Sequence, residues 1–241
     1  MIKDITIGQY IPGESFIHKL DPRTKILITF LFIISLFIVD KFVGYIFVVA
    51  FLALVVYVAK ISPRYLYKGL KPVFLLIALT AILNIFMLRE GRLLFQLGFI
   101  KIYESGIKTA LFMAIRLILL IMGTSVLTLT TSPIELTDGI ERLLRPIGKE
   151  IAHELAMMMT IALRFIPTLI DETDKIMKAQ KARGADFESG GLVKKAKNLI
   201  PLLVPLFISS FRRADELAMA MEARCYRGGA GRTRMKVLKF T

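Results

Sequence analysis

Several residue types that build catalytic and metal centres are scarce in this chain. Among its 241 residues there is one cysteine, Cys225, two histidines, His18 and His153, and no tryptophan. A single cysteine excludes an intrachain disulfide and any cysteine-based metal cluster. Two histidines leave little material for a zinc site. We therefore expect no metal site, no catalytic residues and no cofactor bound by this chain itself.

Acidic residues are also few, 19 against 33 lysines and arginines, so the net charge is +14. In a soluble protein this charge would suggest a nucleic-acid partner. However, 55% of the residues are hydrophobic and the mean hydropathy is +0.63, values typical of a multi-pass membrane protein. Because the positive charges flank apolar runs, we expect the partner to be a lipid bilayer and not nucleic acid. The polar first 25 residues predict no cleavable signal peptide.

The first half of the chain holds four apolar runs, each near the roughly 20 residues that a membrane-spanning helix needs. They are Ile26–Val39, Phe42–Ala59, Pro72–Leu88 and Ile107–Leu129. Residues 1–131 are therefore predicted to form a membrane domain of about four helices.

The lysines and arginines between these runs predict the orientation, because positive loops favour the cytoplasm. The loop after the second run holds four of them, and the loop after the first holds only Lys41. This places the N-terminus and the C-terminal half in the cytoplasm of a cell-membrane protein. The loop after the third run weakens the case, because it is also positive. The residues concerned are Lys60, Arg64, Lys68 and Lys71 in the former loop, and Arg89, Arg92, Lys101 and Lys108 in the latter.

Residues 132–241 are amphipathic, and we interpret them as a cytoplasmic coupling domain of three helices. Ser132, Pro133 and Glu135 predict the start of the first helix, which runs to about Leu144. The other two span about 149–183 and 191–224, each roughly 50 Å long, and are expected to bend at Pro167, Pro201 and Pro205. The predicted fold is thus all-α. Leu199–Ile208 is interpreted as interfacial, with a membrane span as the alternative.

A ten-residue pattern occurs once at the end of each long helix. Asp174, Ala179, Ala182 and Arg183 recur with identical spacing as Asp215, Ala220, Ala223 and Arg224. Small alanines allow close approach of a partner, and a planar guanidinium can pair with a carboxylate through two hydrogen bonds. The less specific interpretation is an arginine in the usual place at a helix C-terminus. The repetition favours two equivalent docking tips, and hence a partner with two equivalent grooves.

The whole chain resembles the transmembrane T component of energy-coupling factor (ECF) transporters, the EcfT/CbiQ-like family. The resemblance rests on Tyr10–Lys25 and on two Ala-Arg-Gly-like motifs, Ala182-Arg183-Gly184 and Ala223-Arg224-Cys225. It implies that the motifs end two crossing coupling helices and dock on two ABC-type ATPase subunits, identical or different, which bind the ATP. It also implies that the chain holds a substrate-binding S component, which selects the vitamin or metal.

Two departures from the family pattern affect this interpretation. Cys225 stands where glycine is usual, so Gly228-Gly229 is an alternative end for the last helix. Family members also usually continue into a further membrane helix, whereas this sequence stops at Phe240-Thr241 after a basic stretch.

Other functions remain open at this stage. A self-contained membrane enzyme acting on a lipid or prenyl substrate could use Asp171, Glu172 and Asp174, although no second acidic motif accompanies them. A channel would conduct ions without partners. His18 with Asp21 is interpreted as a membrane-entry elbow more readily than as a catalytic pair. Arg116 within an apolar run is either functional or buried against a carbonyl or carboxylate partner.

Overall fold

The computed structural model describes residues 10–88, 91–97, 100–187 and 191–229. The described residues form two compact units, one within 10–139 and the other within 140–229. The division falls inside the helix Pro133–Leu144, whereas the predicted domain boundary lies at residues 131–132. The assignment of the units to membrane and cytoplasm stays a prediction.

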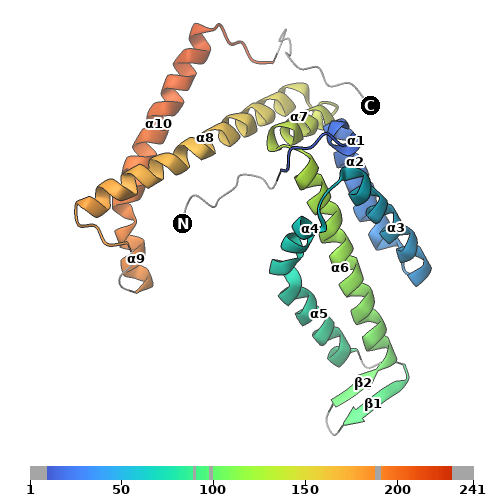
Figure 1. The fold of residues 1–241 in the computed structure, drawn as a ribbon. Helices are drawn as coiled ribbons and strands as arrows, with labels where there is room; N and C mark the ends of the chain where they lie inside the picture. The colour runs from blue at the N-terminus through green and yellow to red at the C-terminus, as the bar shows by residue number, and fades with distance from the viewer. Residues whose placement is uncertain (1–9, 89–90, 98–99, 188–190, 230–241) are drawn as a thin grey trace. The chain divides into compact units, whose positions relative to one another are not determined.

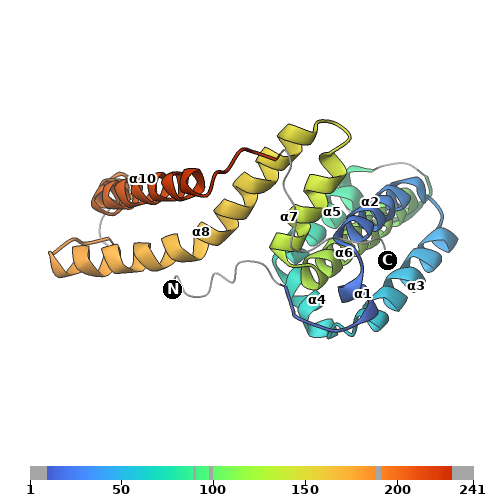
Figure 2. The same ribbon diagram turned by 90° about the horizontal axis from the view of Figure 1, so that it is seen from above.

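The chain is helical throughout the described residues, apart from one short hairpin (Figures 1 and 2). The elements of the first unit are α1 (Phe16–Lys19), α2 (Pro22–Ile38), α3 (Phe42–Ala59), α4 (Pro63–Leu70), η2 (Lys71–Val73), α5 (Phe74–Met87), β1 (Leu93–Leu97), β2 (Ile100–Tyr103) and α6 (Glu104–Thr130). Then follow α7 (Pro133–Leu144), which contains the division, α8 (Lys149–Ala182), α9 (Leu192–Asn198) and α10 (Ile200–Ala223). The prediction of an all-α fold is therefore confirmed.

Helix α6 is the centre of the first unit, and α2, α3, α4 and α5 all pack against it. Gly123 of α6 lets Phe32 of α2 lie so close that a Cβ added there would be 2.4 Å from the ring. Gly106 allows a close contact with the backbone of α5, where an added Cβ would be 3.0 Å from the carbonyl oxygen of Ile85. Small residues permit such close helix packing inside membranes, where the hydrophobic effect does not drive association.

Four helices are long and apolar enough to cross a membrane in the part of the chain that the structure describes. They are Phe42–Ala59, Pro63–Met87, Glu104–Thr130 and Lys149–Ala182. The first three match predicted spans. The fourth is α8, which the sequence predicts to lie in the cytoplasmic coupling domain, and that assignment stays a prediction. Helix α2 has 17 residues and carries the first predicted run.

An antiparallel β-hairpin, which the sequence reasoning missed, joins α5 to α6. Strand β1 pairs with β2 from Leu93 opposite Tyr103 to Leu97 opposite Ile100. The backbone N–H of Glu104 donates to the carbonyl of Arg92 at 3.0 Å, which extends the pairing to the start of α6.

The segment 10–25, on which the family resemblance partly rests, is fastened to the end of α6. The N–H of Ile11 donates to the carbonyl of Leu129 at 3.0 Å. The buried ammonium of Lys25 donates to the carbonyls of Thr130 at 2.9 Å and His18 at 3.0 Å. These contacts satisfy carbonyls that a helix end leaves unpaired.

In the second unit, α8 is one continuous helix of 34 residues that contains Pro167. It bends part-way along its length (Figure 2), as an internal proline predicts. The expected continuous helix from 191 to 224 is wrong, because the chain breaks at Leu199 into α9 and α10. Pro201 has no N–H to continue the helical hydrogen-bond ladder, which accounts for the break beside it.

Candidate functional site

The two predicted tips end in the same backbone arrangement. At the end of α8, the N–H of Gly184 donates to the carbonyl of Lys181, and that of Ala185 to the carbonyl of Gln180, both at 3.0 Å. At the end of α10, Cys225 donates to Glu222 at 2.8 Å and Tyr226 to Met221 at 3.0 Å. This is the Schellman motif in both places, with Arg183 and Arg224 as the capping residues.

The motif needs a left-handed residue directly after the arginine. Gly184 supplies it with φ +86°, and Cys225 supplies it with φ +55°. The alternative that Gly228-Gly229 ends the last helix is therefore wrong, because Cys225 takes the glycine's role despite its side chain. The two hydrogen bonds of the cap hold this conformation, which is unfavourable for residues other than glycine.

The side chains of both tips face solvent. Ala182, Arg183 and Gly184 are exposed, and so are Ala223, Arg224 and Cys225. Neither guanidinium takes part in an ion pair within the described residues. Of the supporting positions, Ala179, Ala220 and Asp215 are exposed, and Asp174 is half-buried with its carboxylate 3.6 Å from the ammonium of Lys178. Both arginines are thus free to meet an external partner.

Helices α8 and α10 cross and are joined by a polar contact (Figure 1). Arg213 of α10 donates to Glu172 of α8 in a short ion pair, and the hydroxyl of Ser209 donates to the other carboxylate oxygen at 2.8 Å. Glu172 and Arg213 are 41 residues apart, the interval that also relates Arg183 to Arg224. The helices therefore meet two residues before each copy of the repeated pattern.

Each tip is also tied to the opposite long helix. The side-chain amide of Gln180 donates to the carbonyl of Pro201 at 3.2 Å. That carbonyl lacks its normal partner, because the residue four positions later is Pro205 and has no N–H. Beyond the other tip, the hydroxyl of Tyr226 lies 3.4 Å from Nε2 of His153 near the start of α8. These ties fix the position of each tip relative to the crossing.

The remaining candidates have structural partners. His18 lies 2.6 Å from the Ser15 hydroxyl and 3.2 Å from the Ile11 carbonyl, so it does not pair with Asp21. The carboxylate of Asp21 instead accepts from Arg23, both from its backbone N–H and from its guanidinium. This geometry fits the interpretation of the segment as an elbow.

Arg116 is held at the connection between α2 and α3. It donates to the Tyr45 hydroxyl at 3.0 Å and to the Val39 carbonyl at 3.3 Å, with the Asp40 carboxylate 3.6 Å away. Pairing with a carbonyl and a carboxylate was one of the two expectations for this residue.

The acidic group on α8 does not resemble a catalytic centre. Glu172 is engaged by Arg213, and Asp174 lies beside Lys178. No group of three or more His, Cys, Asp or Glu residues that could hold a metal ion occurs in the described ranges.

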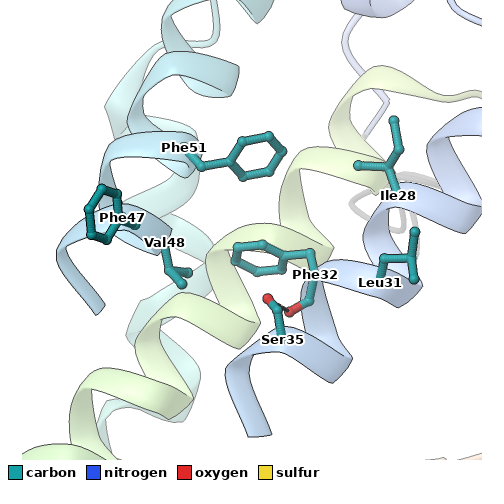
Figure 3. Close-up of a pocket in the computed structure, with 7 residues that line it drawn as sticks. All are labelled: Ile28, Leu31, Phe32, Ser35, Phe47, Val48 and Phe51. Atoms are coloured by element: carbon teal, nitrogen blue, oxygen red, sulfur yellow. Dashed lines mark hydrogen bonds between the residues drawn. The ribbon is translucent and has the colours of Figure 1, made fainter. Parts of the chain in front are cut away.

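A hollow of about 340 Å³ lies between α2 and α3. Figure 3 shows its lining, which is apolar except for one serine: Ile28, Leu31, Phe32, Ser35, Phe47, Val48 and Phe51. The Ser35 hydroxyl donates to the Phe32 carbonyl of its own helix at 2.7 Å. None of these side chains can serve as an acid, a base or a metal ligand, so the hollow is not a catalytic pocket.

Comparison with known proteins agrees with these features. The family model described as cobalt transport protein, CbiQ, matches residues 13–237. The chain is 68% identical over 244 residues to the energy-coupling factor transporter transmembrane protein EcfT of Clostridium kluyveri, covering 100% of this chain and 90% of that protein. The proteins of the same name from Thermosediminibacter oceani and Bacillus subtilis are 61% and 50% identical, over 100% of this chain and 91% and 92% of theirs.

The family model matches nearly the whole chain, and the relatives named above are at least 50% identical over its full length. These matches exclude the enzyme and channel alternatives. The chain is a non-catalytic, multi-pass membrane subunit, and it belongs to the family of transmembrane T components of energy-coupling factor transporters.

Proposed function

We propose that the tips at Arg183 and Arg224 each dock on one ATPase subunit and pass ATP-driven movement to a substrate-binding S component. The observation that carries the proposal is the pair of identical helix caps, each presenting an exposed arginine. One exposed arginine at a helix end is ordinary. Here two exposed arginines have the same cap, and their helices cross at equivalent positions. This arrangement suits two equivalent receptor sites.

The two tip arginines lie at equal distances along their helices from the crossing of α8 and α10. Arg183 follows Glu172 by 11 positions, and Arg224 follows Arg213 by the same interval. At 1.5 Å per residue, each arginine lies about 16 Å along its helix from the crossing. Gln180 contacts Pro201 while Glu172 contacts Ser209 and Arg213, so the helices run in opposing directions at the contact. The tips therefore point away from the crossing on different sides.

The chemistry of each tip suits a carboxylate-lined groove. Ala182 and Ala223 have only a methyl group beside the arginine, so a partner backbone can approach closely. The guanidinium can then bind a carboxylate through two parallel hydrogen bonds. The proposal assigns Asp174, Ala179, Asp215 and Ala220 the supporting role of shaping the adjoining helix face.

Helix α10 also offers a surface for the membrane partner. Large apolar side chains along it are exposed, namely Leu203, Val204, Phe207, Ile208 and Phe211. A helix face this apolar needs either lipid or another protein against it. We assign it to the S component and the membrane interface, with the tips and the N-terminus on the cytoplasmic side.

Charge reversal tests the proposal. Arg183→Glu with Arg224→Glu should abolish copurification of the ATPase subunits while the chain stays in the membrane, and each single reversal should weaken it. Arg164→Glu with Arg212→Glu makes the same change in charge elsewhere on the two helices and should leave copurification intact. Normal association after the double tip reversal would contradict the proposal.

A further inference from the structure

Four cations gather where α3 gives way to α4. Lys60 caps α3 in a left-handed conformation, Arg64 and Lys68 lie on α4, and Lys71 begins η2. All four are exposed, and no carboxylate pairs with any of them among the residues that the structure describes. The sequence contains no Asp or Glu between Asp40 and Glu90, so nearby residues do not offset this charge. We call these four residues the α4 patch.

The helix that carries the patch is strongly amphipathic. Arg64, Lys68 and Lys71 follow one another at intervals of four and three, so they share one face. Leu66 projects from the opposite face and is only 3% exposed within the core of the unit. Gly69 brings α4 against α6, since a Cβ added there would lie 3.1 Å from the Ser125 hydroxyl. The bundle thus holds α4 with its charged face outward.

Tyrosines flank the charges at the level expected of a membrane surface. Tyr57, Tyr65 and Tyr67 are 85%, 43% and 68% exposed. On a helical wheel Tyr65 and Tyr67 fall on either side of the charged face. The patch follows the end of one helix long and apolar enough to span a bilayer, Phe42–Ala59, and occupies the first turns of another, Pro63–Met87. Tyrosine is enriched where such spans meet the lipid headgroups.

We propose that the α4 patch binds the phosphate of an anionic phospholipid in the surrounding bilayer. Basic side chains attract anionic headgroups, at about 1 kcal/mol for each Lys or Arg near the membrane surface. The ends of the adjoining spans place the patch at headgroup depth, and its tyrosines can pack against the first carbons of the acyl chains. The proposal does not depend on the ATPase contacts or on which leaflet the patch faces.

The test uses the full chain in detergent and native mass spectrometry to count bound lipids. Dioleoylphosphatidylglycerol should bind more tightly than dioleoylphosphatidylcholine. The triple variant Arg64→Gln, Lys68→Gln, Lys71→Gln should lower the affinity for the anionic lipid at least tenfold, a modest part of what three such contacts can contribute. The charge-preserving triple Arg64→Lys, Lys68→Arg, Lys71→Arg should retain it, which separates charge from misfolding.

A matched control places the same loss of charge on α9. Lys194→Gln, Lys195→Gln, Lys197→Gln should leave lipid binding unchanged, because these exposed lysines belong to the other unit. Equal binding of the two lipids, or equal losses in the two glutamine triples, would overturn the proposal.

Glycerol phosphate alone should compete poorly with the phospholipid for the α4 patch. Full competition by this soluble headgroup would show a free-phosphate site and would overturn the assignment to lipid. Loss of ATPase copurification in the patch triple with unchanged lipid binding would assign the patch to a protein partner and also overturn it.

Discussion

Glu172 of α8 and Arg213 of α10 form an ion pair, and each lies two residues before one copy of a pattern that occurs twice, 41 residues apart. The same interval relates the two exposed arginines at the helix tips. Each tip arginine therefore follows the contact residue of its own helix by the same number of positions.

Exchanging these charges tests whether the ion pair holds α8 and α10 together at their crossing. Arg213→Glu places two carboxylates at the crossing, so we expect loss of ATP-driven uptake and about 1 kcal/mol of destabilisation. Glu172→Arg combined with Arg213→Glu restores opposite charges and should recover most of both. Uptake in reconstituted vesicles and the thermal unfolding midpoint report the two effects. Failure of the exchange to recover uptake, with the fold intact, would argue against this role.

The contact between Gln180 and Pro201 is suited to a double-mutant cycle. Gln180→Leu leaves the Pro201 carbonyl without its donor and should cost about 0.5–1 kcal/mol, because the bond is exposed to solvent. Pro205→Ala supplies a backbone N–H four positions after Pro201, so Gln180→Leu should cost less in that background. Thermal unfolding of the four proteins measures the coupling. Additive costs would show that Gln180 does not substitute for the missing N–H.

Cys225 carries a left-handed backbone that glycine adopts more easily. Cys225→Gly should keep the cap and raise the free energy of unfolding by about 0.5–1 kcal/mol, the relief of strain being partly offset by the greater freedom of glycine when unfolded. Cys225→Val should lower it, because a β-branched residue disfavours this conformation. Thermal unfolding measures the stability of each variant, and ATPase copurification shows whether the tip keeps its geometry. Greater stability of the valine variant would contradict the cap geometry.

The N-terminal segment should be sensitive to acid through His18. Burial lowers the pKa of His18, the hydrogen bond to the Ile11 carbonyl opposes that shift, and the charge of Lys25 adds to it. A histidine whose pKa is lowered on folding favours the neutral form. It therefore contributes stability above its unfolded pKa of about 6.5, and this is lost as the pH falls through the folded value. The protection factors of amides 10–20, which compare the observed exchange rate with the intrinsic rate at the same pH, should fall below about pH 6.5, and His18→Gln should reduce that dependence. A pH response unchanged by the substitution would place its origin elsewhere.

Much of the fold follows from local sequence signals. The apolar run Phe42–Ala59 was predicted to the residue, because Lys41 and Lys60 bound it on both sides. The start of α7 was predicted from Ser132 and Glu135, and the structure shows the N–H of Glu135 donating to the Ser132 hydroxyl at 3.2 Å. Caps and charges at helix ends act over a few residues, so they can be recognised in a sequence.

Features that depend on distant partners were not predicted. Cysteine gives no hint of a left-handed residue, and only the cap bonds to Glu222 and Met221 reveal it. The buried ammonium of Lys25 requires the carbonyl of Thr130, 105 residues later. The crossing did have a signal, since Glu172 and Arg213 are oppositely charged at equivalent positions, but opposite charges alone do not establish contact.

The central claim is that each tip meets its own ATPase subunit, and the single cysteine of the chain offers a direct test. Cys225 is exposed at the second tip. Moving it, as Cys225→Gly with Gly184→Cys, transfers the one thiol to the first tip, where a Cβ meets no atom within 4 Å but the left-handed φ of +86° strains a side chain, as the φ of +55° does at Cys225. A short bifunctional thiol-to-amine reagent should then cross-link each form to one ATPase subunit, and a chain with both cysteines to two. Cross-links from only one tip, or from neither, would contradict the account.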